Sequence, residues 1–210
     1  MALRRLYRKR RPVRRARRVA RKPGSRGLVR AISNPGVHSY KRTQYFASAL
    51  SVSNLAEVYG SYAFQLSALA NASEYTVLYD MYKISAVKWT LMPRGNSAEA
   101  GTNNNNTKIM TVLDYDDDNT PTSVDQLCQY ESVKTTNLSR DHSRYLKPKF
   151  ARAIYKTAVT TGYGVGTGWI DCDSTDVPHY GIKYALLRTT SGTVTYDLKV
   201  TYYLQFKGVR

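Results

Sequence analysis

Cysteine, histidine and long apolar runs are scarce in this 210-residue chain. The only cysteines, Cys128 and Cys172, form no CxxC spacing, which excludes a dense disulfide framework and predicts two free thiols in a reducing compartment. The three histidines, His38, His142 and His179, are scattered and make no zinc or HExxH motif. No apolar run approaches the roughly 18 residues that span a bilayer, and none follows the basic N-terminus as a secretory signal requires. We therefore expect an intracellular protein without membrane spans.

Acidic residues are absent from the first part of the chain. Residues 1–42 contain 16 Lys and Arg and no acid, whereas residues 43–210 contain the other 16 bases and all 15 acids. The net charge of +17 therefore divides into +16 and +1. Because like charges repel and apolar surface is lacking, we expect residues 1–42 to be a mostly disordered arm and linker. Residues 43–210 are expected to fold as one domain.

The partner predicted for this arm is a nucleic acid. Arginine predominates, and its guanidinium binds phosphate bidentately while keeping its charge. A membrane surface is a weaker alternative, since the arm has no strongly apolar helical face. The cluster at residues 8–11 also matches nuclear-import signals, so host import factors are possible partners. The predicted nucleic-acid-binding residues are Arg4, Arg5, Arg8, Lys9, Arg10, Arg11, Arg14, Arg15, Arg17, Arg18, Arg21, Lys22, Arg26 and Arg30.

The remainder of the chain has the pattern of an all-β domain. From residue 194 to residue 206 every even position is apolar, which predicts a long strand with one face on the core. Seven further strands are predicted at 43–53, 61–68, 82–93, 107–114, 131–137, 144–155 and 181–189. The apolar phase shifts within 82–93, which suggests a bulge. Only 72–81 and 123–130 favour short helices, so eight strands indicate a β-sandwich or jelly roll.

Two loop motifs suggest chemistry weakly. The acidic run contributes Asp114, Asp116, Asp117 and Asp118, whose hard oxygens suit Ca²⁺, but the EF-hand spacing is absent, so a solvated turn or a charged subunit contact is favoured. The glycine-rich run 162–168 has neither GxGxxG nor GxxxxGK[ST] and is expected to be a flexible loop. No catalytic arrangement is recognisable, and no enzymatic activity or cofactor is expected.

Several segments together resemble the capsid proteins of circular, Rep-encoding single-stranded DNA viruses, such as circoviruses and cycloviruses. These segments are 82–94 (YKISAVKWTLMPR), the acidic run 114–118, residues 121–123 and 126–127, 144–149 (RYLKPK) and 202–207 (YYLQFK). The resemblance implies a single eight-stranded viral jelly roll and self-assembly into an icosahedral shell of about sixty copies. It also implies an arm on circular single-stranded DNA, residence in the virion, and assembly in the host nucleus. The sequence predicts no particular host attachment factor.

Two other functions stay open at this point. A small RNA or satellite virus capsid would carry a similar arm, since phosphate contacts do not distinguish DNA from RNA. A cellular basic β-barrel that binds nucleic acid is less favoured, because such modules spread basic residues over the domain, whose net charge here is only +1.

Overall fold

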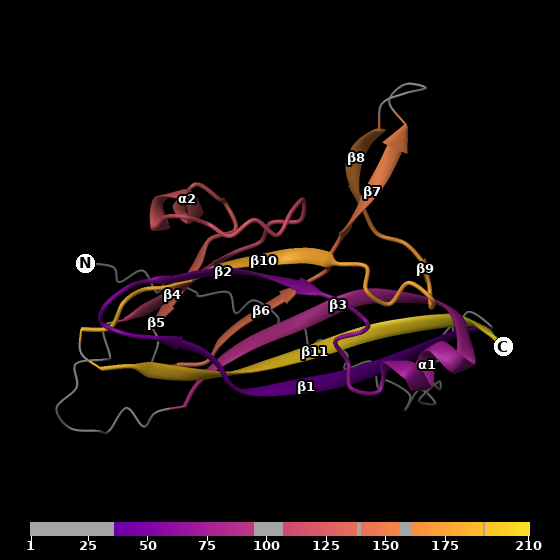
Figure 1. Cartoon of the computed structure of the whole chain (residues 1–210), viewed down its shortest axis with the longest axis horizontal. Helices are drawn as coiled ribbons and strands as arrows, with labels where there is room; N and C mark the ends of the chain where they lie inside the picture. The colour runs from indigo at the N-terminus through magenta and orange to yellow at the C-terminus, as the bar shows by residue number, and fades with distance from the viewer. Residues whose placement is uncertain (1–35, 95–106, 138–139, 156–160, 191) are drawn as a thin grey trace, which may run out of the picture. The chain divides into compact units, whose positions relative to one another are not determined.

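The C-terminal strand is central to the larger of two antiparallel sheets. The computed structural model describes residues 36–94, 107–137, 140–155, 161–190 and 192–210. Strands β1, β11, β3 and β6 pair in that order, and the short β9 also pairs with β3 (Figure 1). Their bounds are Val37–Val52 for β1, Val194–Val209 for β11, Tyr79–Pro93 for β3, His142–Leu146 for β6 and Ile170–Asp171 for β9.

The second sheet pairs β2, β10, β4 and β5 and packs against the first. Its strands are Val58–Phe64, His179–Leu186, Lys108–Val112 and Lys134–Asn137 in that order. A hairpin of β7 (Phe150–Tyr155) and β8 (Thr161–Gly166) projects from it between β6 and β10 (Figure 1). Two four-stranded antiparallel sheets whose neighbours are distant in sequence form a jelly roll, which confirms the predicted fold class. The strands β7, β8 and β9 are additions to the eight.

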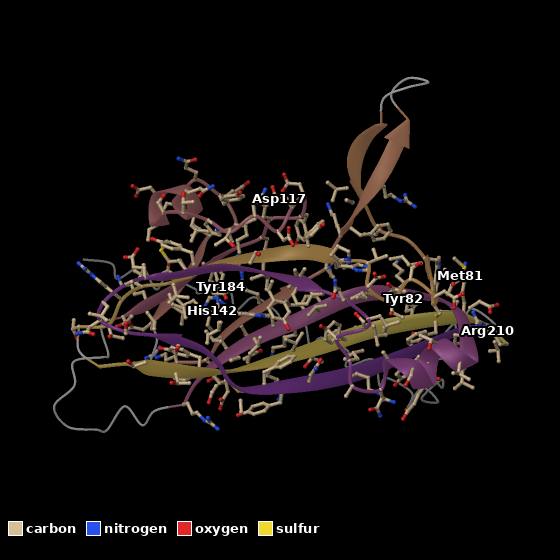
Figure 2. All side chains as sticks on the ribbon, viewed as in Figure 1. Met81, Tyr82, Asp117, His142, Tyr184 and Arg210 are labelled. Carbon is tan, nitrogen blue, oxygen red and sulfur yellow. The ribbon has the colours of Figure 1, made fainter. Side chains whose placement is uncertain are left out.

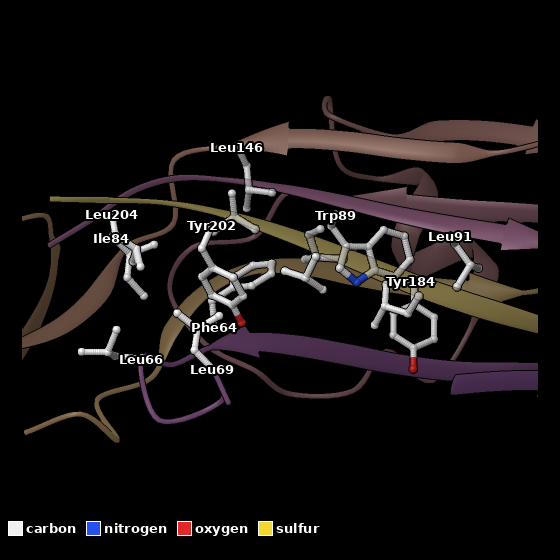
Figure 3. Packing of buried hydrophobic residues seen from close by; sticks show 14 of the residues in the cluster. Phe64, Leu66, Leu69, Ile84, Trp89, Leu91, Leu146, Tyr184, Tyr202 and Leu204 are labelled. Atoms are coloured by element: carbon white, nitrogen blue, oxygen red, sulfur yellow. The ribbon is translucent and has the colours of Figure 1, made fainter. Parts of the chain in front are cut away.

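The core lies between the two sheets and is rich in aromatic rings (Figure 3). Even positions of β11 point into it, since Tyr196, Leu198, Val200, Tyr202, Leu204 and Phe206 are all buried. The predicted long C-terminal strand with one face on the core is therefore confirmed, and β11 lies between β1 and β3. Trp89 of β3 stacks on Tyr184 of β10 with ring centroids 6.1 Å apart, and so joins the sheets.

The predicted irregularity in the third strand is also confirmed. Tyr203 pairs with Ala86 but Leu204 pairs with Ile84, so Ser85 is an extra residue in β3. This bulge is what moves the apolar phase, because both Ile84 and Val87 then face the core.

The two helices are shorter than predicted. Helix α1 covers Ala72–Leu78, and the chain becomes strand at Tyr79 because β11 offers it a partner. Helix α2 covers Val124–Cys128 and is capped by Ser123, whose hydroxyl accepts a hydrogen bond from the Gln126 amide.

Three other boundaries were predicted wrongly. Strand β1 begins at Val37, within the predicted linker, because β11 supplies a pairing edge as far as Lys207. The predicted strand 144–155 is two strands, since Pro148, which lacks an amide hydrogen, separates β6 from β7. Residues 161–166 form β8 instead of a loop, because backbone pairing with β7 does not depend on side chains.

Candidate nucleic-acid interface

The predicted binding residues of the arm, Arg4 to Arg30, lie outside the described residues. Their role, like the division into an arm at 1–42 and a shell domain at 43–210, stays a prediction. Within the described part of the chain, basic and acidic residues lie on different faces of the domain, although the net charge of residues 43–210 is only +1.

The outward face of the β1-β11-β3-β6 sheet carries lysines on β1, β11 and β3, and it carries tyrosines on β1, β11 and β6. Strand register assigns them to this face, because their partners alternate with the buried positions of β11. We call this surface the lysine–tyrosine face. It comprises Lys41 and Tyr45 of β1, Lys199, Tyr203 and Lys207 of β11, Lys83 and Lys88 of β3, and Tyr145 of β6.

The tyrosines of this face are accessible and lie among the lysines. Tyr45 is 55% exposed and Tyr145 is 60% exposed. The rings of Tyr145 and Tyr203 meet edge to face with centroids 5.9 Å apart. The ammonium of Lys41 lies 5.8 Å from the centre of the Tyr203 ring, and Lys88 pairs across the strands with Tyr145. Lysine ammonium groups and tyrosine rings therefore lie next to one another on this surface.

Asp197 lies at one end of this face, and its charge is already matched. Asp197 accepts hydrogen bonds from the Tyr45 hydroxyl and from the Ser48 amide, and it forms an ion pair with Arg94 at 3.5 Å. The hydrogen bonds from Tyr45 and Ser48 lower the pKa of Asp197. The carboxylate also holds Ser48 at a φ of 52°, where β1 shifts register. Among the described residues, none of the face lysines forms an ion pair.

The outward face of the other sheet is covered and acidic. Residues 113–133, including α2, lie over it, and Leu127 packs there against Met110, Val112 and Ala185 in a second small core. This segment contains six acids and no base. The two sheets therefore present opposite chemistry to solvent.

Two carboxylates of the acidic run bind a lysine of the sheet beneath. Lys183 of β10 lies 2.8 Å from an oxygen of Asp114 and 2.5 Å from one of Asp117 (Figure 2 labels Asp117). Burial disfavours the charge of Asp114, but hydrogen bonds involving Asp116, Lys183 and Tyr130 outweigh it and lower its pKa. Burial likewise disfavours the Lys183 ammonium, but its bonds to both carboxylates outweigh burial and raise its pKa.

The ion pairs of Asp114 and Asp117 with Lys183 therefore attach the covering segment to β10. In the described residues no group of three or more histidine, cysteine or acidic side chains could hold a metal ion. The Ca²⁺ candidate at Asp114, Asp116, Asp117 and Asp118 therefore gains no support from the geometry, which orients Asp114 and Asp117 toward an internal ammonium.

His142 of β6 is buried between hydroxyl groups (Figure 2). Its Nε2 lies 2.8 Å from the Thr111 hydroxyl and its Nδ1 lies 2.8 Å from the Thr136 hydroxyl. Burial, with the nearby charges of Lys134 and Arg144, lowers the pKa of His142 to about 4. The two threonines satisfy both ring nitrogens, which is the arrangement of a structural histidine.

The comparison with protein families decides what the chain is. The model of the circovirus capsid protein family matches residues 3–210, and so nearly the whole chain. The chain belongs to the circovirus capsid protein family. This confirms the resemblance found in the sequence, and it overturns the alternative of a cellular β-barrel module.

Solved structures show the same fold. A chain of the BFDV capsid protein, described as a 60-mer, aligns with a TM-score of 0.64 at 22% identity over 82% of this chain and 94% of its own. The BFDV capsid protein described as a decamer gives 0.59 at 23% identity over 81% and 99%. A structure from red clover necrotic mosaic virus gives 0.54 at 16% identity over 81% and 56%. No curated protein matches. The described part of the chain contains no helix long and apolar enough to cross a membrane.

Sequence reasoning missed the lysine–tyrosine face because it summed charge over the whole domain. A signal was present, since the odd positions of 194–206 alternate with the apolar ones and include Lys199 and Tyr203. The register that brings Lys41, Lys88 and Tyr145 beside them follows only from the sheet order.

Proposed function

We propose that this circovirus-family capsid protein assembles into the icosahedral shell of a small virion and packages circular single-stranded DNA through its Arg-rich arm. The observation that carries the proposal is that the family match begins at residue 3 and so includes the arm as well as the jelly roll. A relative with the same fold is described as a 60-mer, which supports a shell of about sixty copies.

The charge of the arm suits a genome bound for its phosphates. Sixty arms with 16 bases each supply about 960 positive charges, the product of the two numbers. That would neutralise a large part of a genome of about one to two kilobases, and small cations would balance the rest. Such binding requires no base-specific contact.

The experiment is expression of the full chain, purification of particles, and electron microscopy with measurement of protected nucleic acid. Icosahedral particles containing nuclease-resistant DNA are expected. Replacing the arm bases Arg14, Arg15, Arg17 and Arg18 with Gln should lower the packaged amount, and replacing exposed Lys108 and Lys134 of the domain should not. Normal packaging by the arm variant would contradict the arm's role, and packaged RNA would favour the RNA-virus alternative.

Binding by the arm should depend strongly on salt. If half of the 16 bases engage single strands, log K falls by about 5 to 6 per tenfold rise in salt, because each neutralised phosphate contributes about −0.7. Titration of the protein with unrelated oligonucleotides at several salt concentrations measures the slope. An affinity that barely changes with salt, or that favours one sequence by orders of magnitude, would contradict this mechanism.

The arm is also proposed to direct the protein to the host nucleus through its cluster at residues 8–11, which import factors recognise by charge. A fluorescent fusion of the full chain should accumulate in nuclei. Replacing these four bases with Gln should leave it in the cytoplasm.

A further inference from the structure

The β7-β8 hairpin is a two-stranded ribbon that no other strand of the described chain extends. Its strands pair only with each other, and the hairpin projects from the side of the smaller sheet (Figure 1). It is held at its base, where buried Phe150 meets the His179 ring edge to face with centroids 5.3 Å apart. A two-stranded hairpin is marginally stable in water, because it has no core of its own. A second surface packed against the hairpin would stabilise it.

One face of the hairpin is apolar and exposed. Residues 150–166 contain no acid and two bases. One of the bases, Arg152, has its guanidinium 5.7 Å from the centre of the Phe150 ring and its stem over Gly166, which has no Cβ to obstruct it. On the other face Ala151 pairs with Val165, and both are exposed. Strands that stay in water usually carry charges that prevent association, so this uncharged pair is free for a contact.

A second apolar surface lies where α1 meets the last residues of β11. Val77, Leu78 and Val209 are 71%, 53% and 63% exposed, and we call them the α1 patch. They are neighbours, because Val209 pairs with Tyr79 and the Arg210 amide donates a hydrogen bond of 3.1 Å to the Leu78 carbonyl oxygen. Six large aliphatic side chains are exposed among the described residues, and four of them lie on this patch or on the hairpin. Exposed apolar residues that lie together mark a contact surface, whereas isolated ones are ordinary.

We propose that the β7-β8 hairpin of one copy packs, through Ala151 and Val165, on the α1 patch of a second copy of this chain. The hairpin projects from the side of the smaller sheet, whereas α1 lies beside β1 and β11, so a copy cannot cover its own patch (Figure 1). A contact between two different surfaces leaves one free hairpin and one free patch until a ring or shell closes. The inference rests on the proposed function, since it takes assembly of many copies as given, and it names two surfaces that join them.

The charges beside the two surfaces favour a protein partner over a nucleic acid. Arg152 lies over Phe150, on the other face of the hairpin. Arg210, beside the α1 patch, forms ion pairs with Asp80 and Asp173. These two bases are therefore already engaged within the domain. Aliphatic side chains surrounded by matched charges are typical of the centre of a protein–protein contact, which is depleted of free charge.

Particle yield from the full chain tests each surface. Val165→Glu should lower the yield measured by sedimentation about tenfold or more, because the contact would bury a carboxylate, whereas Val165→Ile should not. Leu78→Lys should have the same effect as Val165→Glu. The matched control is Val133→Glu, a change at an exposed valine of the covering segment, and it should leave the yield unchanged. Melting temperatures of the unassembled subunits verify that each variant is folded.

A double variant tests whether the two surfaces meet. Val165→Glu combined with Leu78→Lys places opposite charges in the contact, so it should recover about half of the particles of the unchanged chain although each single change removes them. Val165→Glu combined with Leu78→Glu places like charges there and should recover none.

Cysteine cross-linking tests the same contact without added charge. In a Cys128→Ser background, which removes the exposed native thiol, Val165→Cys with Leu78→Cys should give a ladder of disulfide-linked copies on mild oxidation. Neither cysteine alone should link copies. Linked dimers from either single variant would mean that like surfaces meet, and the inference would be wrong.

The outcomes separate this inference from the proposed function. If the unchanged chain forms no particles, both are overturned. If it forms particles and the variants Val165→Glu and Leu78→Lys do so equally well, only the inference is overturned. The same holds if both single variants fail but the double variant and the cysteine pair neither recover nor link copies. Variants that assemble normally but no longer attach to host cells would assign these surfaces to a host receptor, and the inference would again fail.

Discussion

The two sheets share one core but treat their outward faces differently. In the β2-β10-β4-β5 sheet, β10 is buried on both sides, because Tyr184 faces the core while Lys183 and Ala185 lie under the covering segment. In the β1-β11-β3-β6 sheet, the core-facing positions of β11 such as Val200 are buried, whereas its outward positions range from buried Thr201 to exposed Lys199. The β2-β10-β4-β5 sheet is therefore covered on both faces, whereas the β1-β11-β3-β6 sheet has one face toward solvent.

The sequence pattern of a strand reflects whether one or both of its faces are covered. Residues 181–186 of β10 are all buried, and Lys183 is the only charged residue among them, which is typical of a strand covered on both faces. Strict alternation in 194–206 is typical of a strand with one face in water. Residues that bind a partner are then expected among the polar, solvent-facing positions of such a strand.

The strongest predicted effect distinguishes the core-facing side of the β1-β11-β3-β6 sheet from its solvent-facing side. Val87 is fully buried and its neighbour Lys88 is exposed. Val87→Asp places an unpaired charge in the core and should destabilise the domain by more than about 4 kcal/mol, which prevents folding. Lys88→Asp should change the free energy of unfolding by less than about 1 kcal/mol. Soluble yield and urea denaturation compare the pair, and equal loss in both would contradict the assigned faces.

The next predicted change in stability tests how the acidic segment 113–133 is attached to β10. Lys183→Met leaves Asp114 buried without its cation and should destabilise the domain by about 3 to 5 kcal/mol. The double variant with Asp114→Asn should recover part of that loss, because the uncompensated charge is gone. Exposed Lys108 of the same sheet is the control, and Lys108→Met should be nearly neutral. Equal unfolding midpoints for the two single variants would show that the bridge contributes nothing.

A smaller effect is the pH dependence contributed by His142. Its pKa is about 4 in the folded domain against about 6.5 when unfolded, so the unfolded chain binds more protons between these values. The contribution is complete above pH 6.5 and is lost as the pH falls toward 4, by at most about 3 kcal/mol. His142→Gln should flatten this part of the stability profile. An unchanged slope between pH 6.5 and 4.5 would assign it to other groups.

The smallest predicted change in stability concerns an exposed ion pair at the end of the β1-β11-β3-β6 sheet. Arg210 lies 2.8 Å from Asp80, and both side chains are about half exposed. Water and salt screen such pairs, so Arg210→Gln should lower the melting temperature only slightly, and by less than Lys183→Met does. Thermal melting at low and high salt measures it. A loss comparable to that of Lys183→Met would remove the distinction between exposed and buried pairs.

Local patterns in the sequence were enough to predict the fold class, the family resemblance and the position of the long C-terminal strand. These follow from local patterns, since alternation over 194–206 and the phase shift that marks the bulge at Ser85 depend only on neighbouring residues. The excess of positive charge in residues 1–42 is equally local, and it predicts a polyanion as the partner of the arm.

Where the strands begin, and which side chains share a face, depends on contacts between segments that are distant in the sequence. Residues 37–42 are strand because β11 offers them a partner, and the glycine-rich β8 is strand because β7 does. The lysine–tyrosine face gathers residues from 41 to 207 by the register of four strands, and Asp114 meets Lys183 across 69 positions of sequence. Pairing energy depends on contacts between distant segments, so no window of sequence contains it.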